Sequence, residues 1–304
     1  MFDSQIRRNI TIALFFANMG IVAFGRCLFV GFFLTILDQK KRISEQKTLP
    51  VQPEEANNEK FSIMIIGIIV AMEKEFVQLR TLLDEASTER HNRKDFVVGQ
   101  MGNNTIVMQQ CGIGKVNAAI GAVEMIDHYQ PDLVISTGVA GGADVGMNIM
   151  DVVVSTECTY HDVYCGPDVT YGQLIGTPAR FRSPKELIAK ACNNNAIPTE
   201  GGAKSAAGSV ASVVHPGLIV TGDWFVDKKE KMQAILEKFP EAKAVDMESC
   251  AIAHTCHIYG VPFVSFRIIS DIPLKDTDAS QYFDFWARLA EGSFRVTKQF
   301  VESL

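Results

Sequence analysis

The stretch IIGIIVAMEKE, residues 65–75, joins an apolar run to an acidic turn. The run begins at Ile63 and continues to Val70 without a charged residue. It is typical of a strand covered on both faces, because a half-exposed strand alternates apolar and polar side chains. The amphipathic stretch 74–83 behind it predicts a helix. A buried strand that leads directly into a helix indicates an α/β domain with parallel strands.

The same succession of strand and helix continues along the chain. Gly102-Asn103-Asn104 predicts a hairpin turn between two of the strands. The predicted strands cover residues 63–70, 96–100, 105–110, 133–137, 151–157, 218–221, 244–246 and 263–269, and the predicted helices cover 74–83, 115–128, 184–193, 228–239, 249–259 and 281–303. This alternation predicts a three-layer α/β/α sandwich with a central mixed, largely parallel sheet.

Residues 1–42 have a different composition. Residues 10–37 are almost wholly apolar, with two arginines before them and a Lys-Lys-Arg cluster after them. This length and these flanks indicate an N-terminal hydrophobic helix that acts as a membrane anchor. Arg26 lies near the middle of the run, where a charge is costly, and leaves a signal peptide as the alternative. No small-x-small cleavage site follows, which favours the uncleaved anchor.

Residues 43–62 are polar, contain two prolines and lack an apolar period, which is the composition of a linker. We therefore expect a hydrophobic segment over 1–42, a linker over 43–62 and a catalytic domain over 63–304. Positive charge is slightly heavier after the apolar run, and this favours a cytoplasmic location for the domain. Met64 offers an alternative, internal start that would remove the residues before it.

The net charge argues against a nucleic-acid partner, and the pattern of cysteine and histidine residues argues against a metal site. The chain has 304 residues, of which 47% are hydrophobic and 21% charged, and its formal net charge of −6 argues against nucleic acid as a partner. Its 7 cysteines form no C-x-x-C pair and are typical of reduced thiols in a reducing compartment. His254, Cys256 and His257 lie on an apolar helix without a second cluster of ligands, so no metal site is predicted.

Acidic residues follow three of the predicted strands at the point where each strand ends. Glu75 follows the first strand, Glu248 follows strand 244–246, and Asp271 follows strand 263–269. Ligands of open α/β sheets bind at the carboxyl ends of the strands, so we expect these carboxylates to converge. Each acid alone also fits a helix-capping role. The three together favour an enzyme that uses acid and base chemistry.

Two glycine-rich turns follow other strands. They are CGIGK at 111–115 and TGVAGG at 137–142. Each turn suits either the close approach of a ligand to the backbone or a tight connection between packed elements. Neither contains the full G-x-G-x-x-G pattern, which argues against a dinucleotide site.

Eight sequence blocks, taken in order, identify a known family. They are GIIVAMEKE, CGIGKVNAA, TGVAGG, YHD, YGQ, TGDWFV, VDMESCAIAH and SFRIISD. From about Ile65 to the C-terminus the chain resembles the bacterial 5′-methylthioadenosine/S-adenosylhomocysteine nucleosidases. The resemblance implies a nucleoside phosphorylase-like fold, a homodimer and no cofactor. It also implies hydrolysis of these two thioether nucleosides to adenine and a thioribose product, a reaction of methionine salvage and of the recycling of methylation by-products.

The resemblance assigns a role to each carboxylate. Glu75 matches the residue that positions and deprotonates the attacking water, and Arg267 matches an arginine near that water. Asp271 matches the proton donor to the adenine ring, with Ser270 as its neighbour in the motif. Glu248 matches the carboxylate that binds the ribose hydroxyls. These roles fit the chemistry, because cleavage builds positive charge on the ribose and negative charge on the departing purine.

The resemblance also implies a set of substrate contacts. It implies that Phe225 stacks on adenine and that the backbone of Val226 binds the edge of the base. The other implied contacts, on the sugar side and along the remaining wall, are Met247, Met72, Ile113, Tyr282, Val139, Ala140, Gly141, Val245 and Asp246. The chain departs from many relatives at two of these positions. Val139 stands where they have serine, and Asp246 stands where they have glutamate.

Three alternatives stay open at this point. A phosphorylase needs cationic groups around a phosphate dianion, whereas no arginine or lysine directly precedes the turn at Gly138. A nucleosidase acting on futalosine or AMP would share most of the site, although Ile113, Met72 and Phe181 predict an apolar lining that suits a thioether. A membrane-tethered nucleoside receptor would have no use for Glu75.

Overall fold

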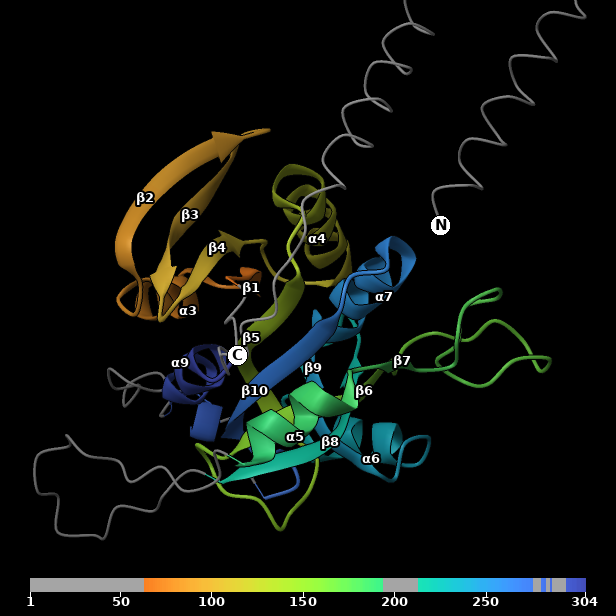
Figure 1. Cartoon of the computed structure of the whole chain (residues 1–304). Coiled ribbons are helices and arrows are strands. Elements are labelled where there is room, and N and C mark those ends of the chain that lie inside the picture. The colour runs from red at the N-terminus through yellow and green to blue at the C-terminus, as the bar shows by residue number, and fades with distance from the viewer. Residues whose placement is uncertain (1–62, 194–212, 276–279, 283–284, 286–293) are drawn as a thin grey trace, which may run out of the picture. The chain divides into compact units, whose positions relative to one another are not determined.

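Strand β1 (Ile65–Val70) lies between two parallel neighbours, β4 (Asn104–Gln110) and β5 (Leu133–Gly142), in a ten-stranded sheet (Figure 1). This computed structural model describes residues 63–193, 213–275, 280–282, 285 and 294–304. The central position of β1 buries Ile66 and Ile68 completely. The apolar run at 65–70 is therefore required by burial on both faces of the sheet.

The remaining elements follow the predicted alternation. The other strands are β2 (Asp84–His91), β3 (Lys94–Met101), β6 (Val152–Tyr160), β7 (Phe181–Arg182), β8 (Val214–Thr221), β9 (Ala242–Asp246) and β10 (Phe263–Asp271). The helices are α3 (Glu73–Arg80), α4 (Lys115–Tyr129), α5 (Lys185–Asn193), α6 (Lys229–Leu236), α7 (Ser249–Tyr259) and α9 (Arg295–Glu302). Each predicted strand, and each predicted helix before the last, corresponds to one of these elements.

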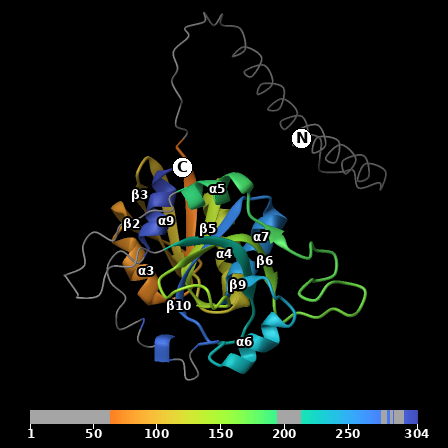
Figure 2. The same ribbon diagram turned by 90° about the horizontal axis from the view of Figure 1, so that it is seen from below.

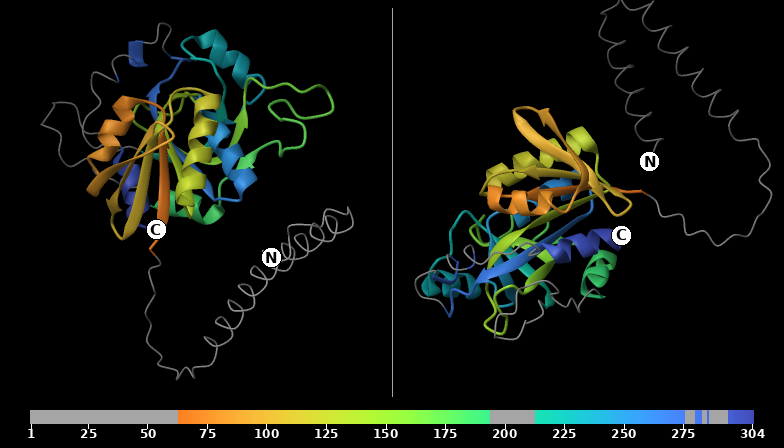
Figure 3. Two further views of the ribbon diagram at one scale, coloured as in Figure 1. Left: turned by 90° about the horizontal axis from the view of Figure 1, so that it is seen from above. Right: turned by 90° about the vertical axis from the view of Figure 1, so that its left-hand side faces the viewer.

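Helices cover both faces of the sheet, as the three-layer prediction requires. On one face, α4 and α7 pack against each other and share a hydrophobic core with Ile69 of β1. On the other face, α3, α5 and α9 share a core with Ile66 and Ile68. Figures 2 and 3 show α4 on one side of the strands and α5 and α9 on the other. Successive side chains of β1 thus enter different cores, which follows from the two-residue period of a strand.

Five strands of the sheet close into a ring. β5 pairs with β10, β10 with β6, β6 with β8, and β8 with β9. Gly141 and Gly142 at the end of β5 then pair with Val245 and Ala244 of β9 and complete the ring. The sheet is mixed, as predicted, but 5 of the 10 pairings among the described strands are antiparallel. The ring brings the carboxyl ends of β5, β9 and β10 to one edge.

Several predictions differ from the structure or lie outside it. β2 was not predicted, because its sequence DEASTERH is polar and almost wholly exposed, and its order comes from pairing with β3 at the sheet edge. The predicted final helix 281–303 corresponds to helical residues 280–282 and to α9, and most of the stretch between them lies outside the described residues. The expected N-terminal helix and linker also lie outside them. Among the described helices, none is long and apolar enough to cross a membrane.

Candidate active site

A cleft opens where the carboxyl ends of β1, β5, β9 and β10 meet. The turn after β4 and the loop after β8 also contribute to its walls. The cleft is lined by Ala71, Met72, Glu75, Ile113, Val139, Ala140, Gly141, Trp224, Phe225, Val226, Val245, Asp246, Met247, Glu248, Ser270, Asp271 and Tyr282. Of the residues selected from the sequence, Arg267 and Phe181 are absent from this lining. Ala71 and Trp224 line the cleft although neither was selected.

Glu75 is almost completely buried in the first turn of α3. One carboxylate oxygen accepts hydrogen bonds from the backbone N–H groups of Ala71 and Met72, at 3.2 and 3.0 Å. The other oxygen accepts one from the N–H of Val139 at 2.9 Å. Burial raises the pKa of Glu75, while the positive charge of Arg267 and these backbone donors oppose the shift. Glu75 therefore caps α3 and faces the cleft at the same time.

Glu248 directly precedes α7 and reaches the glycine turn at 111–115. Its Oε1 accepts a hydrogen bond from the backbone N–H of Gly114 at 2.9 Å. Its Oε2 lies 3.8 Å from Nη2 of Arg267. Burial raises the pKa of Glu248 to about 7; Arg267 opposes this shift and the negative charge of Asp246 adds to it. Two buried acids with raised pKa values in one cleft are typical of a site that transfers protons.

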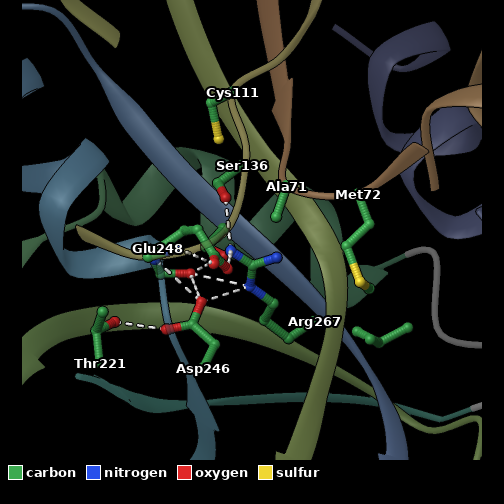
Figure 4. A network of polar contacts seen from close by, with 12 residues as sticks. Ala71, Met72, Cys111, Ser136, Thr221, Asp246, Glu248 and Arg267 are labelled. Atoms are coloured by element: carbon green, nitrogen blue, oxygen red, sulfur yellow. Dashed lines mark hydrogen bonds and ion pairs between the residues drawn. The ribbon is translucent and has the colours of Figure 1, made fainter. Parts of the chain in front are cut away.

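Arg267 lies behind the wall of the cleft and is 1% exposed. Its Nε is 2.6 Å from Oδ2 of Asp246, and its Nη2 donates a hydrogen bond to the hydroxyl of Ser136 at 2.8 Å (Figure 4). Asp246 also accepts hydrogen bonds from the hydroxyl of Thr221 at 2.5 Å and from the backbone N–H of Ser249 at 3.0 Å. Both oxygens of Asp246 thus receive protein donors. Asp246 therefore balances the charge of Arg267 and accepts a hydrogen bond from the first backbone N–H of α7. It is also part of the lining of the cleft.

Gly138 leaves space that two charged groups fill. A Cβ atom at this position would lie 2.5 Å from Nη1 of Arg267 and 2.6 Å from Oε1 of Glu75. Both distances are shorter than real Cβ atoms tolerate, so any side chain here would displace one of the two groups. The glycine at 138 is therefore required by the packing of Glu75 and Arg267 against the backbone of β5.

Asp271 ends β10 at the same edge of the sheet. Its Oδ1 accepts a hydrogen bond from the hydroxyl of Ser270 at 2.6 Å. Asp271 is also in register with Gly141 of β5, which is part of the lining. Glu75, Glu248 and Asp271 thus reach one cleft from three different elements, as the strand-end rule predicted.

Large apolar side chains line the rest of the cleft and remain about half exposed. The exposed fractions are 52% for Ile113, 47% for Trp224 and 48% for Phe225. The ring of Tyr282 meets that of Phe225 edge to face, with 5.1 Å between the centroids. Exposed aromatic and aliphatic side chains around a few polar groups are typical of a pocket for a planar, mostly apolar ligand.

One expected lining residue lies elsewhere. Phe181 belongs to β7 and stacks on the ring of His254, with 4.7 Å between the centroids, so it is not part of the cleft. The Nδ1 atom of His254 is 3.2 Å from the hydroxyl of Tyr160. Within the described part of the chain, no group of three or more His, Cys, Asp or Glu side chains is arranged to bind a metal ion.

Comparison with known proteins shows to which family this chain belongs. The sequence profile of the phosphorylase superfamily matches residues 65–302. A 5′-methylthioadenosine/S-adenosylhomocysteine nucleosidase from Exiguobacterium sp. is 42% identical over 227 residues, which are 73% of this chain and 90% of that protein. The chain belongs to this nucleosidase family. The resemblance carried by the eight sequence blocks is thus confirmed over nearly the whole catalytic domain.

Solved structures share the fold of this nucleosidase. The nucleosidase of Colwellia psychrerythraea, in complex with adenine, superposes with a TM-score of 0.72 at 34% identity and covers 80% of this chain and 97% of its own. The futalosine hydrolase of Helicobacter pylori superposes with a TM-score of 0.68 at 26% identity and covers 80% of this chain and 99% of its own. The nucleoside phosphorylase-like fold is therefore confirmed. The roles of individual residues in this nucleosidase remain predictions.

Two residues of the cleft region depend on neighbours distant in the chain and were not predicted from the sequence. Trp224 stands beside Phe225 in the TGDWFV block, and an apolar side chain in a loop was the only available signal. Gly138 was predicted only as part of a glycine turn. Glycine is required at this position because Glu75 and Arg267 approach it from other elements. In this nucleosidase, sequence motifs selected the carboxylates that line the cleft but not the residues that make space for them.

Proposed function

We propose that this protein hydrolyses the N-glycosidic bond of 5′-methylthioadenosine and S-adenosylhomocysteine, releasing adenine and the thioribose product. The observation that carries the proposal is the convergence of Glu75, Glu248 and Asp271 on one cleft whose other walls are apolar and aromatic. Membership in the nucleosidase family supports the same reaction. Methylthioadenosine offers a planar base, two ribose hydroxyls and an apolar methylthio tail, which match the three kinds of wall. Adenosylhomocysteine shares the base, the ribose and the thioether sulfur.

The proposed mechanism gives Glu75 the role of general base. Its carboxylate removes a proton from water, and the resulting hydroxide attacks C1′ of the ribose as the bond to adenine breaks. The raised pKa of Glu75 makes it a stronger base than an exposed carboxylate. The donors at Ala71, Met72 and Val139 fix its orientation before the substrate arrives.

Asp271 and Glu248 act on the two fragments of the breaking bond. Asp271 donates a proton to the adenine ring, which neutralises the negative charge that develops on the departing base. Glu248 accepts hydrogen bonds from the ribose hydroxyls and stabilises the positive charge that develops on the sugar. Arg267 offsets part of the negative charge that Glu75, Asp246 and Glu248 bring together.

Hydrolysis is favoured over phosphorolysis by the charges around the cleft. Nη2 of Arg267 lies 3.8 Å from Oε2 of Glu248, and Arg267 is buried in an ion pair with Asp246 behind the wall of the cleft. No lysine or arginine stands among the described lining residues. A phosphate dianion beside three carboxylates would be repelled, and the 5′-phosphate of AMP would meet the same field.

A substrate panel tests the proposal. Purified protein is incubated in phosphate-free buffer with methylthioadenosine, adenosylhomocysteine, futalosine and AMP, and adenine or hypoxanthine release is followed by chromatography. We expect release from the two thioether nucleosides only, at a rate unchanged by added phosphate. Preferential cleavage of futalosine or AMP, or a requirement for phosphate, would overturn the assignment.

We further propose that the catalytic domain is a homodimer. Val116 and Ile120 lie one turn apart on α4 and are 70% and 46% exposed, next to the half-exposed Ile113 of the cleft. Two such side chains on a surface helix are typical of a subunit contact. Light scattering tests this: we expect a dimer for the parent and a monomer for Val116→Asp. A monomeric parent would contradict it.

The N-terminal segment is proposed to tether a cytoplasmic domain, residues 63–304, to a membrane. The apolar composition of residues 10–37 supports this, and Phe61–Leu304 form a separate compact unit. Cell fractionation and N-terminal sequencing test it: we expect the full chain in the membrane fraction. Soluble protein beginning at Met64 would decide for the internal start instead.

A further inference from the structure

Two loops that bear cleft residues and a third loop meet at Lys115, outside the cleft itself. The glycine turn 111–115 carries Ile113, and its Gly114 N–H binds Glu248. The loop 222–226 after β8 carries Trp224, Phe225 and Val226. The third segment follows β6 and contains His161 and Asp162.

Lys115 joins all three through its side chain and its backbone. Its Nζ is 2.8 and 2.6 Å from the two carboxylate oxygens of Asp162 and 3.7 Å from Oδ2 of Asp223. Its backbone N–H donates a hydrogen bond to Oδ1 of Asp223 at 2.8 Å. The backbone N–H of Asp223 in turn donates to Oδ2 of Asp162 at 2.9 Å. These contacts form a closed circuit, which we name the Lys115 clasp (Lys115, Asp162 and Asp223).

The clasp lies directly beside residues that line the cleft. Gly114 precedes Lys115, and a Cβ atom on Gly114 would be 3.0 Å from Oδ1 of Asp223, so the loop after β8 packs against this turn. Trp224 and Phe225 follow Asp223. A shift of the clasp would therefore move the partner of Glu248 and the expected adenine-stacking ring together.

The segment after β6 also contacts the end of β8 and the loop that follows it. The backbone N–H of His161 donates a hydrogen bond to the carbonyl of Thr221 at 2.9 Å. His161 meets Trp224 only through ring packing, with 5.3 Å between centroids, and neither ring nitrogen has a hydrogen-bond partner among the described residues. Asp162 is 10% exposed and Lys115 is 23% exposed at the side chain, so their ion pair is shielded from most of the solvent. A shielded, doubly hydrogen-bonded pair restrains loops better than an exposed one.

We propose that Lys115 is a positioning residue that sets the distance between the sugar side and the base side of the cleft by holding Asp162 and Asp223. The inference rests on the proposed function, because it assigns Glu248 to the sugar and Phe225 to the base. Lys115 itself touches neither the reacting atoms nor the lining. Its loss affects substrate and transition state alike, so KM changes more than kcat.

The first test is the kinetic split in Lys115→Met, which keeps the length of the side chain and removes its charge. We expect KM for methylthioadenosine to rise about tenfold while kcat changes less than about threefold, as for a loss of uniform binding. Lys115→Arg should restore most of the affinity. Lys298→Met, which removes an ion-paired lysine of α9, is the control and should leave both constants unchanged. An unchanged KM in Lys115→Met, or a loss confined to kcat, would overturn the proposal.

The second test does not depend on turnover. In a Trp286→Phe background, Trp224 is the only tryptophan, and its fluorescence anisotropy reports the motion of the loop after β8. We expect lower anisotropy in Lys115→Met than in the parent, with Lys298→Met unchanged. Equal anisotropy would overturn the clasp even if the protein hydrolyses methylthioadenosine, and lower anisotropy would support it even if a different nucleoside is the substrate. If Lys115→Met does not melt cooperatively, Asp162→Asn takes its place in both tests.

Discussion

At the scale of single residues, the site depends on how closely two charged side chains approach one backbone. Gly138 permits Glu75 and Arg267 to lie beside β5, because a Cβ atom would come within 2.6 Å of both. We expect Gly138→Ala to lower kcat/KM by at least about 100-fold, since small displacements of reacting groups are that costly. Gly146→Ala, in an exposed turn, is the matched control and should be nearly neutral. A fully active Gly138→Ala would show that the packing is not required.

Glu75 and Asp271 are expected to act on different atoms of the substrate. Glu75→Gln and Asp271→Asn should each keep adenine binding, measured by calorimetry, and each lose at least about 100-fold in turnover, because each removes one proton-transfer step. Glu75→Gln also points an amide N–H₂ at backbone N–H donors, so its melting temperature should fall. The rate must therefore be expressed per folded molecule. Undiminished turnover in either variant would refute its role.

At the scale of elements, the sequence predicted the structure where burial alone decided it. The apolar run of β1 and the helix α4 follow from their own residues, so both were recognised with nearly correct ends. β2 was missed because its polar sequence is held by hydrogen bonds from β3 and not by burial. The evenly mixed pairing was also underestimated, because the closure of β5 onto β9 depends on contacts between distant parts of the chain.

Likewise, one part of the candidate site could be predicted from the sequence and another part could not. The three carboxylates follow strand ends and family motifs, so the sequence located them. Their surroundings depend on side chains from other elements, such as the capture of Asp246 by Arg267 and Thr221, and no local pattern signals that. The capping explanation for Glu75 was not wrong, because the structure combines the cap with the place in the cleft.

One buried side chain attaches α9 to the start of the domain. Asn104 accepts a hydrogen bond from the backbone N–H of Met64 and donates one to the carbonyl of Val301, each at 3.1 Å. We expect Asn104→Ala to lower the free energy of unfolding by about 2 kcal/mol, since two bonds are lost near buried backbone. Urea titration measures the change, and Ser87→Ala on the exposed β2 serves as control. A change no larger than that of the control would contradict this account of α9.

At the scale of the whole molecule, the cleft concentrates negative charge and links stability to pH. Burial raises the pKa of Glu248 from 4.5 to about 7, so the folded protein holds a proton that the unfolded chain releases. A raised carboxyl pKa contributes stability that is fully present below about pH 4.5 and is lost as the pH rises through about 7. The unliganded protein should therefore melt at lower temperature at pH 8 than at pH 5.

Glu248→Gln isolates this effect, because an amide does not titrate. We expect its melting temperature to fall less between pH 5 and pH 8 than that of the parent, measured by calorimetry without ligand. The exposed Glu237→Gln should behave like the parent. If Glu248→Gln shows the full decline of the parent, the pH dependence does not arise from Glu248.

We propose that three carboxylates in one cleft direct water to the ribose of a thioether nucleoside. Turnover of methylthioadenosine in ¹⁸O-labelled water with phosphate present distinguishes water from phosphate, because mass spectrometry of the sugar product identifies the nucleophile. We expect adenine together with methylthioribose that carries one ¹⁸O atom at C1. Unlabelled methylthioribose 1-phosphate, or no cleavage at all, would contradict it.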